Sequence, residues 1–205
     1  MNKQLLYELD SYYKNNMIDD LNCCSIQSDN DGLNILDFTY GTTPFETFKK
    51  VIDEVKKPKR FIVLGSSIGW QCFFWNSLFP DVPVIGVEIH QLRFEFSCYL
   101  AEKYQIQNIS FINDDMRNMD FENGDLIWEN NVCFFDTSDE VNWRVLTRYE
   151  DIQIVSYSPI LEEHQSKLKL NEILLMDNQG NFKGFTQRIL ELPASWSEKQ
   201  TFHII

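Results

Sequence analysis

The sequence lacks any apolar run that approaches the ~20 residues of a membrane-spanning helix, and Met1–Leu6 lead into a polar segment rather than a signal peptide. Basic charge is also scarce, because 18 Lys and Arg stand against 31 Asp and Glu, for a formal net charge of −13 at pH 7. Nonspecific nucleic-acid affinity rests on clustered basic charge. We therefore expect a cytoplasmic protein that binds neither membrane nor free nucleic acid and whose acidic surface tolerates cationic substrates.

Cysteine and histidine are few, and their spacing indicates no metal site. The five cysteines include no C-x-x-C pair and no Cys/His ligand spacing, so neither a disulfide framework nor a zinc site is expected. The histidines are His90, His164 and His203. A mechanism that depends on histidine therefore has few candidates.

Aromatic residues are plentiful, with 16 Phe, 8 Tyr and 5 Trp among 205 residues. A chain of this length and composition can bury one substantial core, and it contains neither an internal repeat nor a linker that would divide domains. We expect a single domain. The core is also the expected place of Trp128, Trp143 and Tyr157.

Two helices are expected before the first strand. Apolar residues recur at helical intervals over Leu5–Leu21, and Gln27–Gly32 (Q-S-D-N-D-G) has the composition of a turn. Thr43–Glu46 (T-P-F-E) then has the form of a capping box, in which the Thr43 hydroxyl accepts a hydrogen bond from the Glu46 amide. A second amphipathic helix is expected to follow this box.

After Pro58, short apolar runs alternate with helical segments. This alternation predicts an α/β fold with a mostly parallel central sheet and helices on both faces. The last segments have few helical signals and are expected to be antiparallel strands that close one edge of the sheet. The expected strands are Phe61–Leu64, Val84–Val87, Ile109–Ile112, Leu126–Trp128, Ile152–Tyr157, Glu172–Met176, Thr186–Leu192 and Gln200–Ile205. The expected helices are Trp70–Phe79, Leu92–Tyr104 and one near Glu140–Tyr149.

Gly65–Gly69 (G-S-S-I-G) follows the first strand and opens a helix. Ligands of open α/β sheets bind beyond the carboxyl ends of strands, where a turn of small residues lets a ligand approach the backbone. The second strand is followed by Glu88, 23 residues after Gly65 (88 − 65), close to the spacing of a ribose-binding carboxylate. Together they predict a nucleoside-type ligand, although each alone is as typical of strand–helix packing or of a solvated acid.

Polar side chains follow two further strands. Asp115 and Met116 come after the third strand, where a carboxylate can bind an adenine amine and an apolar side chain can cover its ring. Asn130–Phe134 (N-N-V-C-F) follow the fourth strand, and amide oxygens and aromatic faces suit a cationic amine or a sulfonium. Each segment alone is also typical of an ordinary turn.

The turn after the first strand also matches the G-x-S-x-G nucleophile elbow of a serine hydrolase. Ser67 would be the nucleophile, with an aspartate such as Asp151 and with His203 in the required chain order. Such elbows follow several earlier strands and an oxyanion segment, which the residues before Gly65 do not supply. The hydrolase is therefore the weaker hypothesis.

Together these segments resemble S-adenosylmethionine-dependent methyltransferases, and among them the Dot-one family of non-SET, Rossmann-fold histone lysine methyltransferases. The most specific match is Thr39–Glu46 (T-Y-G-T-T-P-F-E), similar to the family's Y-G-E-T-S-F-E. The resemblance implies a Rossmann-like class I methyltransferase domain over residues 39–205, with residues 1–38 as a helical segment packed on it. It also implies S-adenosylmethionine as cofactor, no metal, and a protein lysine or a small cationic molecule as acceptor.

The resemblance also assigns residues to roles. Asn130 and Phe134, in a segment similar to the family's N-N-F-A-F, would border the channel where a lysine amine meets the methyl group. The cofactor would be held by Tyr40, Thr43, Gly65, Ser67, Gly69, Glu88, Asp115 and Met116. Against the family's D-L-G-S-G-x-G and Y-G-E, this chain has Val63 for the acid, Ser67 for a glycine and Thr42 for the glutamate. A catalytically degenerate binding protein is therefore a further hypothesis.

Overall fold

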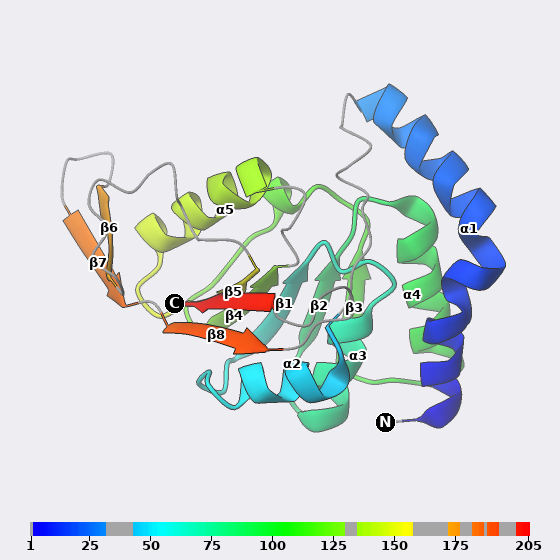
Figure 1. The fold of residues 1–205 in the computed structure, drawn as a ribbon, viewed down its shortest axis with the longest axis horizontal. Helices are drawn as coiled ribbons and strands as arrows, with labels where there is room; N and C mark the ends of the chain where they lie inside the picture. The colour runs from blue at the N-terminus through cyan, green and yellow to red at the C-terminus, as the bar shows by residue number, and fades with distance from the viewer. Residues whose placement is uncertain are drawn as a thin grey trace.

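In the computed structural model a seven-stranded sheet runs in the order β3-β2-β1-β4-β5-β9-β8 (Figure 1). The structure describes residues 2–31, 43–129, 135–157, 172–176, 182–186, 188–192 and 200–205. Among these residues, no helix has both the length and the apolar character to cross a membrane.

The first five strands of the sheet are parallel, and its last two are antiparallel. The parallel strands are β1 (Arg60–Leu64), β2 (Val84–Val87), β3 (Ile109–Ile112), β4 (Asp125–Glu129) and β5 (Gln153–Ser156). β9 (Gln200–Ile204) lies between β5 and β8 (Arg188–Leu192) and runs antiparallel to both. The predicted α/β class, with antiparallel strands closing one edge, is confirmed. Because the chain leaves β1 for β2 and β3 on one side and returns to β4 on the other, β1 and β4 flank a topological switch point.

Two of the late strands do not join this edge. β6 (Glu172–Met176) and β7 (Phe182–Thr186) pair only with each other among the described strands, in a separate two-stranded sheet. The prediction that Glu172–Met176 closes the main sheet is therefore wrong, because the pairing of β8 with β9 and of β9 with β5 already supplies that edge. The predicted strand Thr186–Leu192 is divided, since Thr186 ends β7 and Arg188 begins β8.

Helices cover both faces of the sheet. They are α1 (Lys3–Asp31), α2 (Phe45–Ile52), α3 (Trp70–Leu78), α4 (Gln91–Lys103) and α5 (Phe135–Arg148), with a short 3-10 helix η2 (Met116–Asn118). Because side chains alternate along a strand, β1 sends Phe61 and Val63 into the core shared with α1, α2 and α3. Its Ile62 and Leu64 enter the second core, under α5. In Figure 1, α5 lies on one side of the sheet, and α2 and α3 lie on the other.

Two of the three aromatic residues assigned to the core are there. Trp128 is fully buried, with its ring centroid 5.0 Å from that of Phe48, and Tyr157 is buried beside it at 6.3 Å. Trp143, on α5, is half-buried and packs against the edge of the second core.

Helix α1 is longer than its hydrophobic pattern predicts. It continues to Asp31, so residues 27–31, which were expected to form a turn, are helical. Neither glycine nor proline occurs between Lys3 and Asp31, and the Ser, Asn and Asp residues there disfavour a helix by only tenths of a kcal/mol each. The polar composition was therefore too weak a signal to end the helix.

The predicted capping box does not form. α2 begins at Phe45, Pro44 occupies the N-cap position with φ −55° and ψ 145°, and no side chain caps the helix. Thr43 therefore lies one residue too early to accept from the Glu46 amide. Its side chain is instead fully buried, and its Oγ1 has no hydrogen-bond partner among the described residues.

A buried ion pair fixes α1 against α4. Arg93 donates to Asp20 through Nε at 3.1 Å and Nη2 at 2.8 Å, and the Tyr12 hydroxyl donates to Asp20 Oδ1 at 2.9 Å. Burial opposes ionisation of Asp20, but the Arg93 hydrogen bonds outweigh it and hold the pKa of this carboxyl below its ordinary value. His90 Nε2 lies 3.1 Å from both the Asp20 carbonyl oxygen and Cys24 Sγ, so α1 also packs on the residue that precedes α4.

Removing one member of this pair should strongly destabilise the fold. Asp20→Ala removes both carboxylate hydrogen bonds from the buried Arg93 guanidinium, so we expect the free energy of unfolding in urea to fall by about 3–5 kcal/mol. Glu8→Ala is the matched control, because Glu8 also joins α1 to α4 but bonds Lys103 at the surface. A much smaller loss is expected for Glu8→Ala, and equal losses would contradict the anchoring role of Asp20.

Candidate cofactor site

The carboxyl ends of the parallel strands meet at one edge of the sheet. Leu64, the last residue of β1, lies in register with Val87 of β2 and with Glu129 of β4. The Gly65–Gly69 turn follows β1, and Glu88 follows β2. The structure therefore brings the predicted turn and the predicted acid to the same edge.

The Gly65–Gly69 turn has a tightly constrained backbone. Gly65, Ser67 and Gly69 all have positive φ, of 66°, 51° and 88°. A Cβ added at Gly69 would lie 2.8 Å from Phe73 Cε2 and 3.0 Å from Phe111 Cζ. Gly69 is thus required both for its left-handed conformation and for close packing, whereas Ser67 adopts that conformation with a side chain.

The carboxylate of Glu88 joins the first two strand ends. Its Oε2 accepts from the Ser67 amide at 2.6 Å, and its Oε1 accepts from the His90 amide at 2.8 Å. Glu88 is 6% exposed, so these bonds are shielded from water. Each carboxylate oxygen has a second lone pair, which leaves the group able to accept from the hydroxyls of a ribose.

Asp115 and Met116 lie beyond the end of β3, as predicted. The Asp115 carboxylate caps η2 by accepting from the Arg117 amide at 2.8 Å, and it also pairs with the Arg117 guanidinium, with Nη2 at 2.5 Å. Burial opposes ionisation, but these bonds outweigh it and hold the pKa of Asp115 below its ordinary value. Met116 packs against the core under α5. Most of the accepting capacity of Asp115 is therefore committed to Arg117.

Two buried hydroxyls near the predicted motifs lack partners. Ser66 Oγ, in the turn after β1, and Thr43 Oγ1, before α2, make no hydrogen bond to the described residues. A buried hydroxyl without a partner is destabilising, and a polar ligand can satisfy it. Tyr40, Asn130 and Phe134 lie outside the described residues, so their assignments stay predictions.

Glu129 is a candidate that the motif reasoning missed. It is the last residue of β4, fully buried, and its Oε2 accepts from Ser138 Oγ at 2.6 Å and from Asn142 Nδ2 at 2.9 Å. Burial raises the pKa of Glu129 to about 7, with Asp139 adding to the effect and the two hydrogen bonds opposing it. Its Oε1 has no partner among the described residues. An acid at the end of an apolar strand was the signal that identified Glu88, and it applies equally to Glu129.

The serine hydrolase hypothesis fails on geometry. Asp151 precedes β5 and therefore lies at the amino ends of the parallel strands, opposite the edge that carries Ser67. His203 lies on β9, three strands away from β1, or roughly 14 Å at ~4.8 Å per strand. These three residues cannot form one triad.

Comparisons with known proteins establish the fold. No family model and no curated protein matches the chain. Among solved structures, TrmN from Thermus thermophilus has a TM-score of 0.50 at 14% identity, over 78% of this chain and 47% of that chain. TrmK from M. capricolum, solved with S-adenosylhomocysteine, has a TM-score of 0.47 at 12% identity, over 77% of this chain and 66% of that chain. YcgJ from Bacillus subtilis has a TM-score of 0.44 at 18% identity, over 59% of this chain and 56% of that chain.

This chain thus spans about half the length of the TrmN and YcgJ chains, at 47% and 56%. The likeness to TrmN and the strand order show that the chain has the Rossmann-like α/β fold that was predicted.

The buried acid at the end of β4 should make stability depend on pH. Between the ordinary pKa of 4.5 and about 7, the folded chain keeps the Glu129 proton that the unfolded chain has lost, so this group lowers stability as pH rises. Glu129→Gln stays neutral and should gain roughly 3 kcal/mol relative to wild type between pH 4 and pH 8 in urea unfolding. The exposed Glu122→Gln is the control, and parallel curves for wild type and Glu129→Gln would contradict the buried, protonated acid.

The left-handed backbone conformation of Ser67 should have a measurable effect on the free energy of unfolding. Ser67→Gly removes a Cβ from a residue with φ 51°, so we expect a gain of up to about 1 kcal/mol in the free energy of unfolding. Gly69→Ala is the opposite change at φ 88° and should destabilise the protein, because its Cβ would contact Phe73. Urea unfolding of both variants tests the turn, and a loss for Ser67→Gly would contradict its geometry.

Proposed function

We propose that the chain is an S-adenosylmethionine-dependent methyltransferase whose acceptor is a protein lysine. The observation that carries the proposal is the Glu88 carboxylate, bonded to the Ser67 amide beside the switch point of a methyltransferase fold. Ligands of doubly wound sheets bind at this point, and a carboxylate after the second strand suits a ribose. The resemblance of Thr39–Glu46 to the Dot-one segment supports the same assignment.

The described residues fit the cofactor at its nucleoside end. Glu88 would accept from the ribose hydroxyls, and Gly65 and Gly69 leave the turn without side chains against the ligand. The buried hydroxyls of Ser66 and Thr43 have no partner among the described residues, and a polar group of the ligand that reached them would satisfy them. When bound, S-adenosylmethionine supplies an activated methyl group.

The predicted adenine-binding carboxylate, Asp115, is less available to a ligand than the sequence motif suggests. Met116 offers an apolar side chain, but the Asp115 carboxylate is already bonded to Arg117. An adenine amine would therefore share this carboxylate with the guanidinium or displace it. We expect Asp115 to contribute less to affinity than Glu88 does.

The acceptor assignment rests on the segment that follows β4. Asn130 and Phe134 would border the acceptor channel, and Glu129 immediately precedes them. A lysine amine has an ordinary pKa of about 10.4 and must lose a proton before it can attack a methyl group. Glu129, with its pKa of about 7, can exchange a proton near neutral pH. A small cationic amine is the second candidate, because the same groups and the charge of −13 favour any cationic acceptor.

A degenerate, non-catalytic protein is favoured by two other features. Val63 is fully buried in the core where the family carries an acid, and the Ser67 side chain narrows the turn. Both changes weaken cofactor binding rather than acceptor binding. Cofactor affinity therefore separates this alternative from the enzyme.

Cofactor binding is testable by thermal unfolding. S-adenosylhomocysteine at about 100 times its dissociation constant should stabilise the fold by ~2.7 kcal/mol, a rise of several degrees in Tm for a chain of this size. Glu88→Ala should abolish the rise. Glu102→Ala, the same change on the exposed side of α4, should retain it.

The outcomes separate the hypotheses. No rise at millimolar ligand would contradict the enzyme and favour the degenerate protein, and a rise unaffected by Glu88→Ala would contradict the assigned site. If the cofactor binds, transfer of labelled methyl to a lysine peptide, but not to its arginine counterpart, tests the acceptor. Transfer only to small amines would contradict the lysine assignment.

A further inference from the structure

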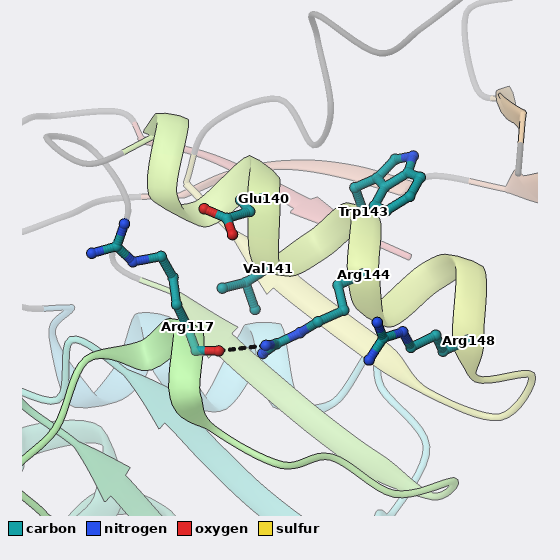
Figure 2. Close-up of a pocket in the computed structure, with 6 residues that line it drawn as sticks. All are labelled: Arg117, Glu140, Val141, Trp143, Arg144 and Arg148. Carbon is teal, nitrogen blue, oxygen red and sulfur yellow. Dashed lines mark hydrogen bonds between the residues drawn. The ribbon is translucent and has the colours of Figure 1, made fainter. Parts of the chain in front are cut away.

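A second concave site lies between η2 and α5, and none of the assigned cofactor residues lines it (Figure 2). It encloses about 190 Å³, which is smaller than the ~300–1,000 Å³ of pockets that hold whole drug-sized ligands. It therefore suits one compact group rather than a complete nucleotide. Its walls are formed by Arg117, Glu140, Val141, Trp143, Arg144 and Arg148.

The pocket is rich in positively charged side chains, whereas the chain as a whole is acidic. Three of the six arginines in the sequence line it, although the chain carries a formal net charge of −13. Glu140, Arg144 and Arg148 are spaced four residues apart on α5, so they share one face of the helix, as Figure 2 shows. The third arginine, Arg117, comes from η2 on the facing wall.

The guanidinium of Arg144 is held in place without being neutralised. Its Nη1 donates to the Arg117 carbonyl oxygen, its Nη2 donates to the Met119 carbonyl oxygen at 3.0 Å, and it lies 5.5 Å from the centre of the Phe121 ring. Carbonyl oxygens and a ring fix its orientation but leave its positive charge. A fixed, uncompensated guanidinium is a preorganised anion ligand.

The other charged side chains of the pocket do not neutralise the Arg144 guanidinium. Arg148 forms no ion pair with any described residue, whereas Arg117 is paired with Asp115. Glu140 lies in the same wall and contributes one negative charge, and it forms no ion pair with the described arginines. The lining of the pocket thus carries three arginines and one glutamate, and within the described part of the chain only Arg117 among these arginines is in an ion pair, with Asp115.

We propose that this pocket binds the phosphate group of a small phosphate monoester, with Arg144 and Arg148 as its ligands. Planar guanidinium groups match the oxygens of phosphate, and the half-buried Trp143 offers an apolar wall for the group that carries it. Nucleic acid is disfavoured as the occupant, because a polyanion needs a continuous basic face and the chain is strongly acidic outside this pocket. The inference does not depend on methyltransferase activity.

The test is calorimetric titration of the full chain with phenyl phosphate and with inorganic phosphate, at constant ionic strength. We expect saturable binding that Arg144→Gln/Arg148→Gln weakens by about tenfold or more. Arg148→Gln alone should weaken binding in part, and it should fold normally because no described residue bonds its side chain. Arg188, on β8, is paired with Glu54, so Arg188→Gln removes the same charge away from the pocket and should leave the phosphate affinity unchanged.

Each other outcome would overturn the proposal. Absence of binding to wild type, or affinity unaffected by Arg148→Gln and by the double variant, would show that the pocket is not an anion site. Tighter binding of a single-stranded RNA oligonucleotide with the same arginine dependence would replace the monoester by nucleic acid. Titration of Arg148→Gln with S-adenosylhomocysteine keeps the result separate from the cofactor site, because this change should leave the affinity for S-adenosylhomocysteine unaltered.

Discussion

The organisation of the candidate site depends on one buried carboxylate. Glu88 accepts from the Ser67 amide after β1 and from the His90 amide before α4, so a single side chain joins the turn after β1 to the start of α4. His90 in turn packs on Asp20 and Cys24 of α1. The N-terminal helix is thereby connected through buried polar contacts to the edge where a ligand would bind, and disturbance of α1 should reach that edge.

The central sheet was predictable because its strands are buried on both faces. Runs such as Phe61–Leu64 and Val84–Val87 are short and continuously apolar, which is typical of parallel strands between helices. The end of α1 was missed because polar residues weaken a helix only slightly, whereas contacts such as Asp20–Arg93 join residues 73 positions apart. The failed capping box at Thr43 shows the same limit, because a shift of one residue in the helix start removes the hydrogen bond.

The site was predictable where spacing along the chain reflects adjacent strand ends. The position of Glu88 beside the Gly65 turn was predictable because both follow neighbouring parallel strands. The ion pair between Asp115 and Arg117 could not be predicted from the sequence, because proximity along the chain does not show which basic side chain a carboxylate will bind. The pocket beside α5 was also hidden, because it forms only when Arg117 is brought against Arg144 from 27 residues away.

The most direct test of the central claim is a crystal structure with S-adenosylhomocysteine. The account predicts the ribose hydroxyls within hydrogen-bonding distance of the Glu88 carboxylate, with the Ser67 and His90 amides still donating to it. The rest of the ligand should lie along the Gly65–Gly69 turn at the carboxyl ends of β1 and β2. Ligand bound elsewhere, or a Glu88 side chain that makes no contact with the ribose, would contradict it.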